Sequence, residues 1–184
     1  MDDHERQRLL AVLASTPARL KQALAGLPRA LVLWTPAPGK WSIQEIVSHL
    51  RDMEREAYLA RYRRMLDEPE PVLADVDGDR RALERGYREE KLALVLRDWN
   101  RLRRECLRLL KKVRGAQWER VGVHETAGRL RMDDLLRRHA FGNDEAHLGQ
   151  IEAIKTRFAI LERLSRGPED LRALTRALSD KAIR

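Results

Sequence analysis

Residues 133–158 read DDLLRRHAFGNDEAHLGQIEAIKTRF, and this stretch decides the fold. At about 100° per residue, five of its apolar side chains fall within one sector of about 60°, which predicts a helix packed against other helices. Because an unpaired polar group in such a sector costs on the order of 1 to 3 kcal/mol, its polar members are expected to have partners on neighbouring helices. The sector contains Leu136, Ala140, Ile151, Ile154 and Phe158, together with the polar residues Asn143 and His147.

Apolar residues at helical spacing also predict three earlier long helices. The second of these begins with a capping box, in which Ser42 and Glu45 each satisfy the other's backbone N–H. Pro17 is a point at which the first helix can break or restart. The expected helices span roughly residues 2–26, 42–66, 80–113 and 133–166.

The segments between these helices are rich in proline, glycine and acidic residues, and are expected to be loops. They cover residues 31–41, 67–79 and 115–131. Gly167 and Pro168 are expected to end the fourth long helix, and a short last helix starts at Pro168.

Composition supports an all-helical protein. The chain has 184 residues, of which 43% are hydrophobic and 36% charged, and it contains no strand-like alternating runs. This length suits one domain, residues 1–184. We therefore expect an all-α four-helix bundle, with connections of about 10 to 17 residues that do not force the simplest up-and-down order.

The setting expected from the sequence is reducing and cytoplasmic. The lone Cys106 cannot form an internal disulfide, and no basic N-terminal region followed by an apolar run and a cleavage site is present. No apolar stretch approaches the roughly 20 residues that cross a bilayer, so a soluble protein without membrane contact is expected.

The formal net charge of +8 raises the question of nucleic-acid binding. Most arginines alternate with acidic residues, as on the solvent face of a helix. One segment differs, because its basic residues recur every three or four positions with little compensating acid. A solvated bundle face is the favoured interpretation of this stripe, phosphate binding is the alternative, and nucleic acid is not the expected partner. The stripe consists of Arg97, Arg101, Arg104, Arg108 and Lys112.

Partners for the inward His147 are few. His49 flanks the apolar stripe of the second helix, and neutral imidazoles on facing helices are common ligands of divalent metals. The alternative is a hydrogen-bonded core histidine. His139 lies eight residues before His147, a rise of about 12 Å, so these two side chains are not expected to share an ion. Asp52 and Glu45 are interpreted as surface charges of the second helix.

Tryptophans are expected to anchor the core and the loops, although an aromatic ring beside a metal cleft can also line a substrate pocket. They are Trp34, Trp41, Trp99 and Trp118.

Two segments, WTPAPGKWSIQEIVSHLRDMERE (34–56) and WERVGVHETAGRLRMDDLLRRHAFGNDEAHLGQI (118–151), resemble the DinB-like superfamily, and the resemblance extends over about residues 9–160. It implies a bundle of up-down-down-up order, often a homodimer, with nickel or zinc held by three histidines. Two of these match His49 and His147, but the position of the third is Asn143.

An asparagine binds zinc or nickel less well than an imidazole, so the altered site leaves three interpretations open. The chain binds a weaker or different ion through His49, His147 and an oxygen donor such as Asn143 or Asp144, it has a cleft without metal, or another side chain replaces the missing ligand. Relatives include transferases that use low-molecular-weight thiols. The expected function is a metal-dependent thiol transferase or hydrolase, and the alternative is an inactive dimeric binding or stress-associated module.

Overall fold

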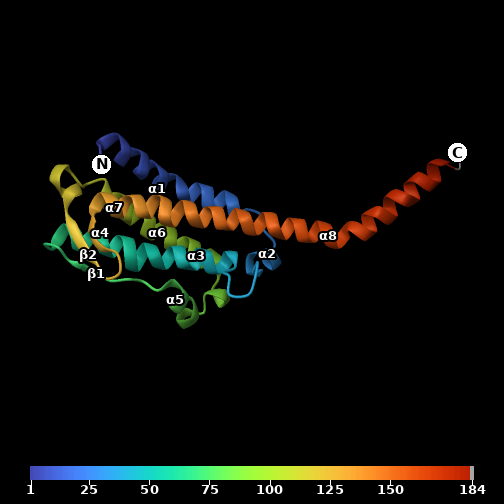
Figure 1. Ribbon diagram of the computed structural model, residues 1–184, viewed down its shortest axis with the longest axis horizontal. Helices are drawn as coiled ribbons and strands as arrows, with labels where there is room; N and C mark the ends of the chain where they lie inside the picture. Colours follow the sequence, from blue (N-terminus) through green and yellow to red (C-terminus); the bar gives the residue numbers. More distant parts are fainter. Residues whose placement is uncertain (183–184) are drawn as a thin grey trace.

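The computed structural model describes residues 1–182, except for the side chains of residues 166 and 168–182. The fold is mostly helical, and its long helices lie alongside one another (Figure 1). Among the described residues, no helix combines the length and the apolar character needed to cross a bilayer. The long helical stretches are α1 (Asp3–Leu24), the continuous run α3 (Ile43–Asp52), η1 (Met53–Leu59) and α4 (Ala60–Asp67), α6 (Leu92–Leu110), and the continuous run α7 (Met132–Arg137), η4 (Arg138–Glu145) and α8 (Ala146–Ala182).

The predicted capping box at the start of α3 is confirmed. The Ser42 hydroxyl oxygen accepts from the Glu45 backbone N–H at 3.3 Å, and the Glu45 carboxylate accepts from the Ser42 N–H at 2.8 Å. Two of the donors that a helix N-terminus leaves unpaired are thereby satisfied. The apolar stripe that follows is buried, which fixes the face that α3 turns toward the core.

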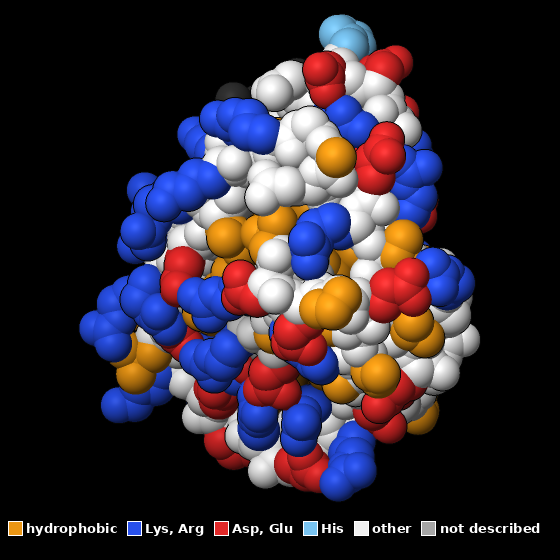
Figure 2. Space-filling model, turned by 90° about the vertical axis from the view of Figure 1, so that its left-hand side faces the viewer, with side chains coloured by type: hydrophobic (Ala, Val, Ile, Leu, Met, Phe, Trp, Pro, Cys, Tyr) orange, Lys and Arg blue, Asp and Glu red, His pale blue; other side chains and the backbone are white. Residues whose placement is uncertain are grey.

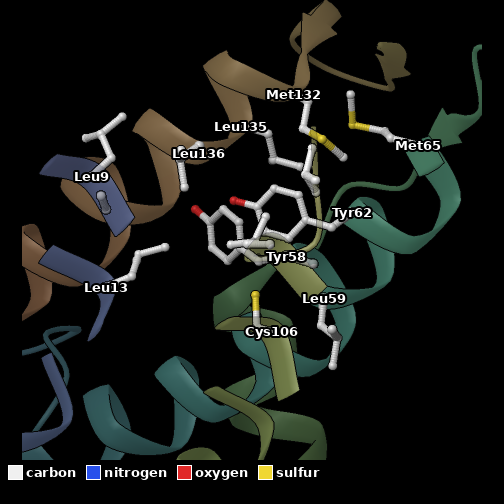
Figure 3. Close-up of a cluster of buried hydrophobic side chains, with 14 of the residues drawn as sticks. Leu9, Leu13, Tyr58, Leu59, Tyr62, Met65, Cys106, Met132, Leu135 and Leu136 are labelled. Carbon is white, nitrogen blue, oxygen red and sulfur yellow. The ribbon is translucent and has the colours of Figure 1, made fainter. Parts of the chain in front are cut away.

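The core consists of two apolar clusters with a polar layer between them. One cluster contains Leu13, Ala57 and Ala140, and Figure 3 shows part of it, including Tyr58 and Tyr62. The other is built around the following group: Leu20, Ile43, Ile46, Val47, Leu50, Trp99, Leu148 and Ile151. The polar layer occupies the intermediate positions on the same helices, namely Glu54, Arg103, His139 and Asp144.

A small sheet corrects the all-α expectation, because the segments predicted as loops contain strands. β1 (Val72–Leu73) pairs in parallel with β2 (Val121–His124), which pairs antiparallel with β3 (Gly128–Arg131). A Cβ on Gly122 would lie 2.7 Å from the Leu73 side chain. Glycine at position 122 therefore leaves room for the Leu73 side chain of β1 against β2. Strands of two and four residues are too short to give a recognisable alternation in sequence.

The third long helix was predicted as continuous, and this was wrong. Its first part is a separate helix, α5 (Gly78–Arg85), followed by the 3₁₀ turn η2 (Tyr87–Glu89) before α6 begins. Gly86 ends α5 with a left-handed φ of +58°, a conformation that glycine adopts at low cost. Two further short elements lie within expected connections, α2 (Arg29–Leu33) and η3 (Gly115–Glu119).

The predicted end of the last long helix at Gly167 and Pro168 was also wrong. α8 continues through both residues to Ala182, so no separate C-terminal helix follows. Proline inside a helix removes one hydrogen bond and bends the axis, but it does not have to end the helix. The projecting part of α8 changes direction away from the body of the molecule (Figure 1). Pro17 likewise lies inside the unbroken α1.

The basic stripe lies on the solvent side of α6 and the turn after it. All of its side chains are exposed, and Arg101 pairs with Asp98 at 2.8 Å. On the end of the molecule that Figure 2 shows, acidic side chains lie among the basic ones. The exposure of the stripe and the pairing of Arg101 with Asp98 agree with a solvated helix face.

Candidate metal centre

The structure brings His49 of α3 and His147 of α8 into contact. Their ring centroids are 4.8 Å apart, and the ring planes are inclined by 70°. His49 directly precedes Leu50, and His147 directly precedes Leu148, and both leucines belong to one apolar cluster. Helix packing thus places two imidazoles from distant parts of the sequence at one point.

Trp41 and Gly78 enclose this histidine pair. The Trp41 ring lies 4.6 Å from the His49 ring and 6.2 Å from the His147 ring, centroid to centroid. Gly78 opens α5 directly against His49, since a Cβ at this position would be 2.8 Å from Nδ1 and Cε1 of the imidazole. Any larger residue at position 78 would force α5 and His49 apart.

Both imidazoles are held in the neutral form. Burial lowers the pKa of His49 to about 3, the neighbouring His147 lowers it as well, and Asp52 opposes these effects. Burial also lowers the pKa of His147, against the opposing influence of Gln150 and Asp144. A neutral imidazole is the form that binds a metal ion.

The hydrogen bonds of the pair leave ring nitrogens available. His147 Nδ1 lies 2.8 Å from Gln150 Oε1, so Nδ1–H donates and the lone pair remains on Nε2. Metal-binding histidines usually make such a bond with their second nitrogen. No described residue forms a hydrogen bond with the ring of His49, which is only 8% exposed. A buried imidazole without a protein partner fits an ion or a water molecule.

Asn143, the third residue of the predicted ligand set, is buried four positions before His147. Its side chain is 3% exposed, and Nδ2 donates to Asp144 Oδ1 at 3.2 Å. Across the described residues, no group of three or more His, Cys, Asp or Glu side chains is arranged to hold a metal ion. The donors that the structure brings together here are two imidazoles, and the predicted third donor, an amide oxygen, would make a weaker set than three imidazoles.

The polar layer of the core lies next to Asn143. Arg103 donates to Glu54 Oε2 at 2.6 Å and to both carboxylate oxygens of Asp144, and all three side chains are fully buried. His139 Nε2 lies 3.0 Å from Glu54 Oε2, while its ring stacks on Tyr58 at 3.9 Å. His139 thus belongs to this layer and not to the histidine pair.

Asp52 was interpreted as a surface charge, which the structure contradicts. The side chain is 1% exposed and accepts hydrogen bonds from Arg51, Arg85 and Tyr87. Burial raises the pKa of Asp52, but together these donors lower it by more, so the net shift of the pKa is downward. Asp52 therefore connects α3 to the segment around α5, whereas Glu45 serves the helix cap.

Several residues around the centre were missed by sequence reasoning. Glu54 follows the buried Leu50 by four positions, and Arg103 follows the buried Trp99 by four. Helical spacing was therefore a signal that could have shown that both side chains face inward. Gln150 follows His147 by three residues, again within reach on one helix face. No local pattern could identify Gly78, because its role depends on where α5 packs.

A groove opens beside the histidine pair. Its volume is about 530 Å³, and two of its lining residues, Trp41 and Gln150, also contact the histidines. Sites for small molecules commonly have volumes in this range. The other lining residues are Pro36, Gly39, Lys40, Ile46, Asp79, Ala153, Ile154 and Arg157.

Comparison with known proteins identifies the family. No curated protein matches the chain. Among solved structures, the chain is similar to YfiT from Bacillus subtilis, with a TM-score of 0.80 and 20% sequence identity over 86% of this chain and 90% of that one. YfiT is described as a probable metal-dependent hydrolase with an unusual four-helix bundle topology, and at this identity the similarity establishes the fold alone. The family model of the DinB superfamily matches residues 4–151, and the chain therefore belongs to the DinB superfamily.

Proposed function

We propose that this protein is a metal-dependent enzyme acting on a small molecule, with a divalent ion held by His49, His147 and Asn143. The observation that carries the proposal is the contact between two neutral imidazoles, one of which has no hydrogen-bond partner among the described residues. The bundle is proposed to have up-down-down-up order, in keeping with the superfamily.

Each residue around the centre has a distinct task. His49 and His147 bind the ion, and Gln150 keeps His147 in the tautomer whose Nε2 is free. Trp41 covers both rings and excludes water from one side. When bound, the divalent ion lowers the pKa of a coordinated water or thiol and so supplies a nucleophile at neutral pH.

The proposed reaction is hydrolysis or thiol-dependent group transfer. The description of YfiT as a probable metal-dependent hydrolase supports the former. The resemblance to the DinB-like superfamily, which implies relatives that use low-molecular-weight thiols, supports the latter. The groove lined by Trp41 and Gln150 has room for a low-molecular-weight thiol or another small substrate. Nickel and zinc are the ions expected from the superfamily, and the proposed location is the cytoplasm.

A second candidate function is that of a catalytically inactive homodimer that serves as a binding or stress-associated module. The observation that favours it is Asn143, which stands where the family pattern has a histidine. Both candidates share a proposed homodimer. Exposed apolar side chains on the projecting part of α8 support such a dimer, namely Ile160 (54% exposed), Leu161 (46%) and Leu164 (68%).

Metal analysis of protein purified without a histidine tag separates the two candidates. The enzyme proposal expects close to one divalent ion per chain, lost in both His49→Ala and His147→Ala. His4→Ala is the matched control, since His4 is exposed and far along the chain from the pair, and it should retain the metal. Folded protein that contains no metal and takes up no added zinc, nickel or manganese would rule out the metal-dependent enzyme.

A further inference from the structure

Asn143 ends in an amide whose two sides differ chemically. Oδ1 can bind a cation, whereas the N–H groups of Nδ2 can only donate hydrogen bonds. The side that faces the histidine pair therefore decides whether Asn143 is a ligand at all. The following inference rests on the proposed metal centre and concerns what fixes this orientation and which ions it favours.

Asp144 determines which way the amide points. Arg103 donates to both oxygens of the buried Asp144 carboxylate. One of these oxygens, Asp144 Oδ1, also accepts a hydrogen bond from Asn143 Nδ2 at 3.2 Å. A carboxylate bound by a guanidinium offers only acceptors, so Asn143 must present its NH₂ group to it. The amide oxygen consequently points away from Asp144.

Asn143 lies on the helix face that carries His147. Asn143 precedes His147 by four residues, so the two side chains share one face of the continuous run from η4 into α8. The Asn143 side chain is 3% exposed, and its bond to Asp144 uses Nδ2. Oδ1 is therefore the atom of this amide that can serve as a cation ligand.

We infer that Asp144, anchored by Arg103, is a positioning residue that turns the amide oxygen of Asn143 toward His49 and His147. The centre then has two nitrogen donors and one neutral oxygen donor. Oxygen donors suit manganese and magnesium, whereas a third imidazole would favour zinc and nickel. The zinc-to-manganese affinity ratio of this site is accordingly lower than that of a three-histidine site.

Titration calorimetry with manganese and zinc chloride on untagged protein tests the choice of ion. Asn143→His should raise zinc affinity by about 10-fold or more and change manganese affinity little, since it exchanges an oxygen donor for nitrogen. Asn143→Leu, which keeps the volume but removes the oxygen, should lower manganese affinity by about 10-fold or more. Manganese affinity unchanged in Asn143→Leu, or both ions gaining equally in Asn143→His, would overturn the inference.

The positioning role of Asp144 needs a separate test. Asp144→Asn puts an NH₂ group beside Asn143, which allows the amide to turn over, and should weaken manganese binding by about 10- to 100-fold. In an Asn143→Asp background the same change should have little effect, because both sides of that side chain are oxygens. Equal losses in both backgrounds would show a merely structural role and refute positioning by Asp144.

The outcomes also separate this inference from the proposed function. Should Asp144→Asn not fold, as judged by circular dichroism and thermal unfolding, the Asn143→Leu titration still decides whether the oxygen binds the ion. If wild type and Asn143→His both bind no ion, the metal centre itself is refuted. If the wild type binds an ion that requires His49 and His147 but ignores Asn143→Leu, only the inference about Asn143 fails.

Discussion

Glu54 is the most constrained carboxylate of the polar layer. Burial raises its pKa, but Arg103 and His139 lower it more strongly, and the balance is a pKa of about 2. One of its oxygens, Oε1, is buried without a hydrogen-bond partner among the described residues. The other, Oε2, accepts two hydrogen bonds from the Arg103 guanidinium. The fold therefore stabilises the ionised form of Glu54, and protonation of Glu54 would destabilise the fold.

Acid should destabilise the protein through Glu54. Because its pKa is depressed from 4.5 to about 2 on folding, its contribution is complete above pH 4.5 and is lost as the pH falls toward 2. Glu54→Gln leaves Arg103 incompletely paired and should cost about 3 to 5 kcal/mol of unfolding free energy at pH 7.

Denaturant unfolding at several pH values measures this effect. The difference between wild type and Glu54→Gln should shrink between pH 4.5 and 2, whereas Glu84→Gln on the exposed face of α5 should resemble wild type throughout. A Glu54→Gln protein as stable as wild type at pH 7 would contradict the assigned role of this ion pair.

Among the elements, α5 has the clearest influence on the candidate site. It is short and mostly exposed, yet its first residue lies against the His49 ring, and Asp77 caps it by accepting from the Arg80 backbone N–H at 3.0 Å. Arg85 at its other end binds the buried Asp52 at 2.6 Å. These contacts hold α5 over α3, and with it one wall around His49.

Gly78→Ala should therefore disturb both stability and metal binding. The added Cβ would lie 2.8 Å from the imidazole and 3.0 Å from Trp41, and overpacking of this kind costs about 1 to 3 kcal/mol. Calorimetric unfolding and metal titration of the variant measure the two effects. Gly149→Ala is the control, because a Cβ there meets nothing within 4 Å, and it should stabilise α8 by about 0.5 to 1 kcal/mol. Normal metal affinity in Gly78→Ala would show that α5 does not shape the site.

The two π-helical segments, η1 and η4, supply three of the four residues of the polar layer. Glu54 belongs to η1, and both His139 and Asp144 belong to η4. A π-helical turn widens the helix locally and is frequent at functional sites. Here these turns border the layer that anchors Asn143, which links the core to the candidate metal centre.

Helical spacing indicated the long helices and the inward direction of His147, because both depend on a repeating apolar pattern. The pairing of His49 with His147 was an expectation from the resemblance to the DinB-like superfamily, since spacing alone left a core histidine as the alternative. The break at Gly86 and the continuation through Pro168 were not predictable in this way, since each depends on one residue whose effect is set by the surrounding packing. The pairing of Val72 with Val123 is a contact between distant segments too short to show a period.

At the candidate site, the tertiary partners of Asn143 and Asp52 could not be predicted from the sequence. Helical spacing indicated that Asn143 faces inward, but it did not reveal that Asp144 holds the amide or that Arg103 holds Asp144. Asp52 was misassigned because its partners Arg85 and Tyr87 come from a segment whose position no local pattern determines. Tertiary partners, rather than residue types, were the missing information.

For the molecule as a whole, the projecting α8 should govern association. Sedimentation equilibrium should find a dimer for the wild type, and Ile160→Lys with Leu164→Lys should shift it toward monomer, because charges on an apolar contact face oppose its burial. Leu83→Lys is the control, as Leu83 is 86% exposed on α5 and remote in sequence from α8. A monomeric wild type, or a double variant that dimerises equally well, would contradict the proposed role of this helix.

X-ray diffraction from crystals of untagged protein grown with manganese, recorded where manganese scatters anomalously, locates the ion itself. An anomalous peak within bonding distance of His49 and His147, with the Asn143 amide oxygen as the third protein donor, is the predicted result. Well-ordered imidazoles with no peak between them, in crystals grown with manganese and also in crystals grown with zinc, would contradict the metal centre on which the proposed function depends.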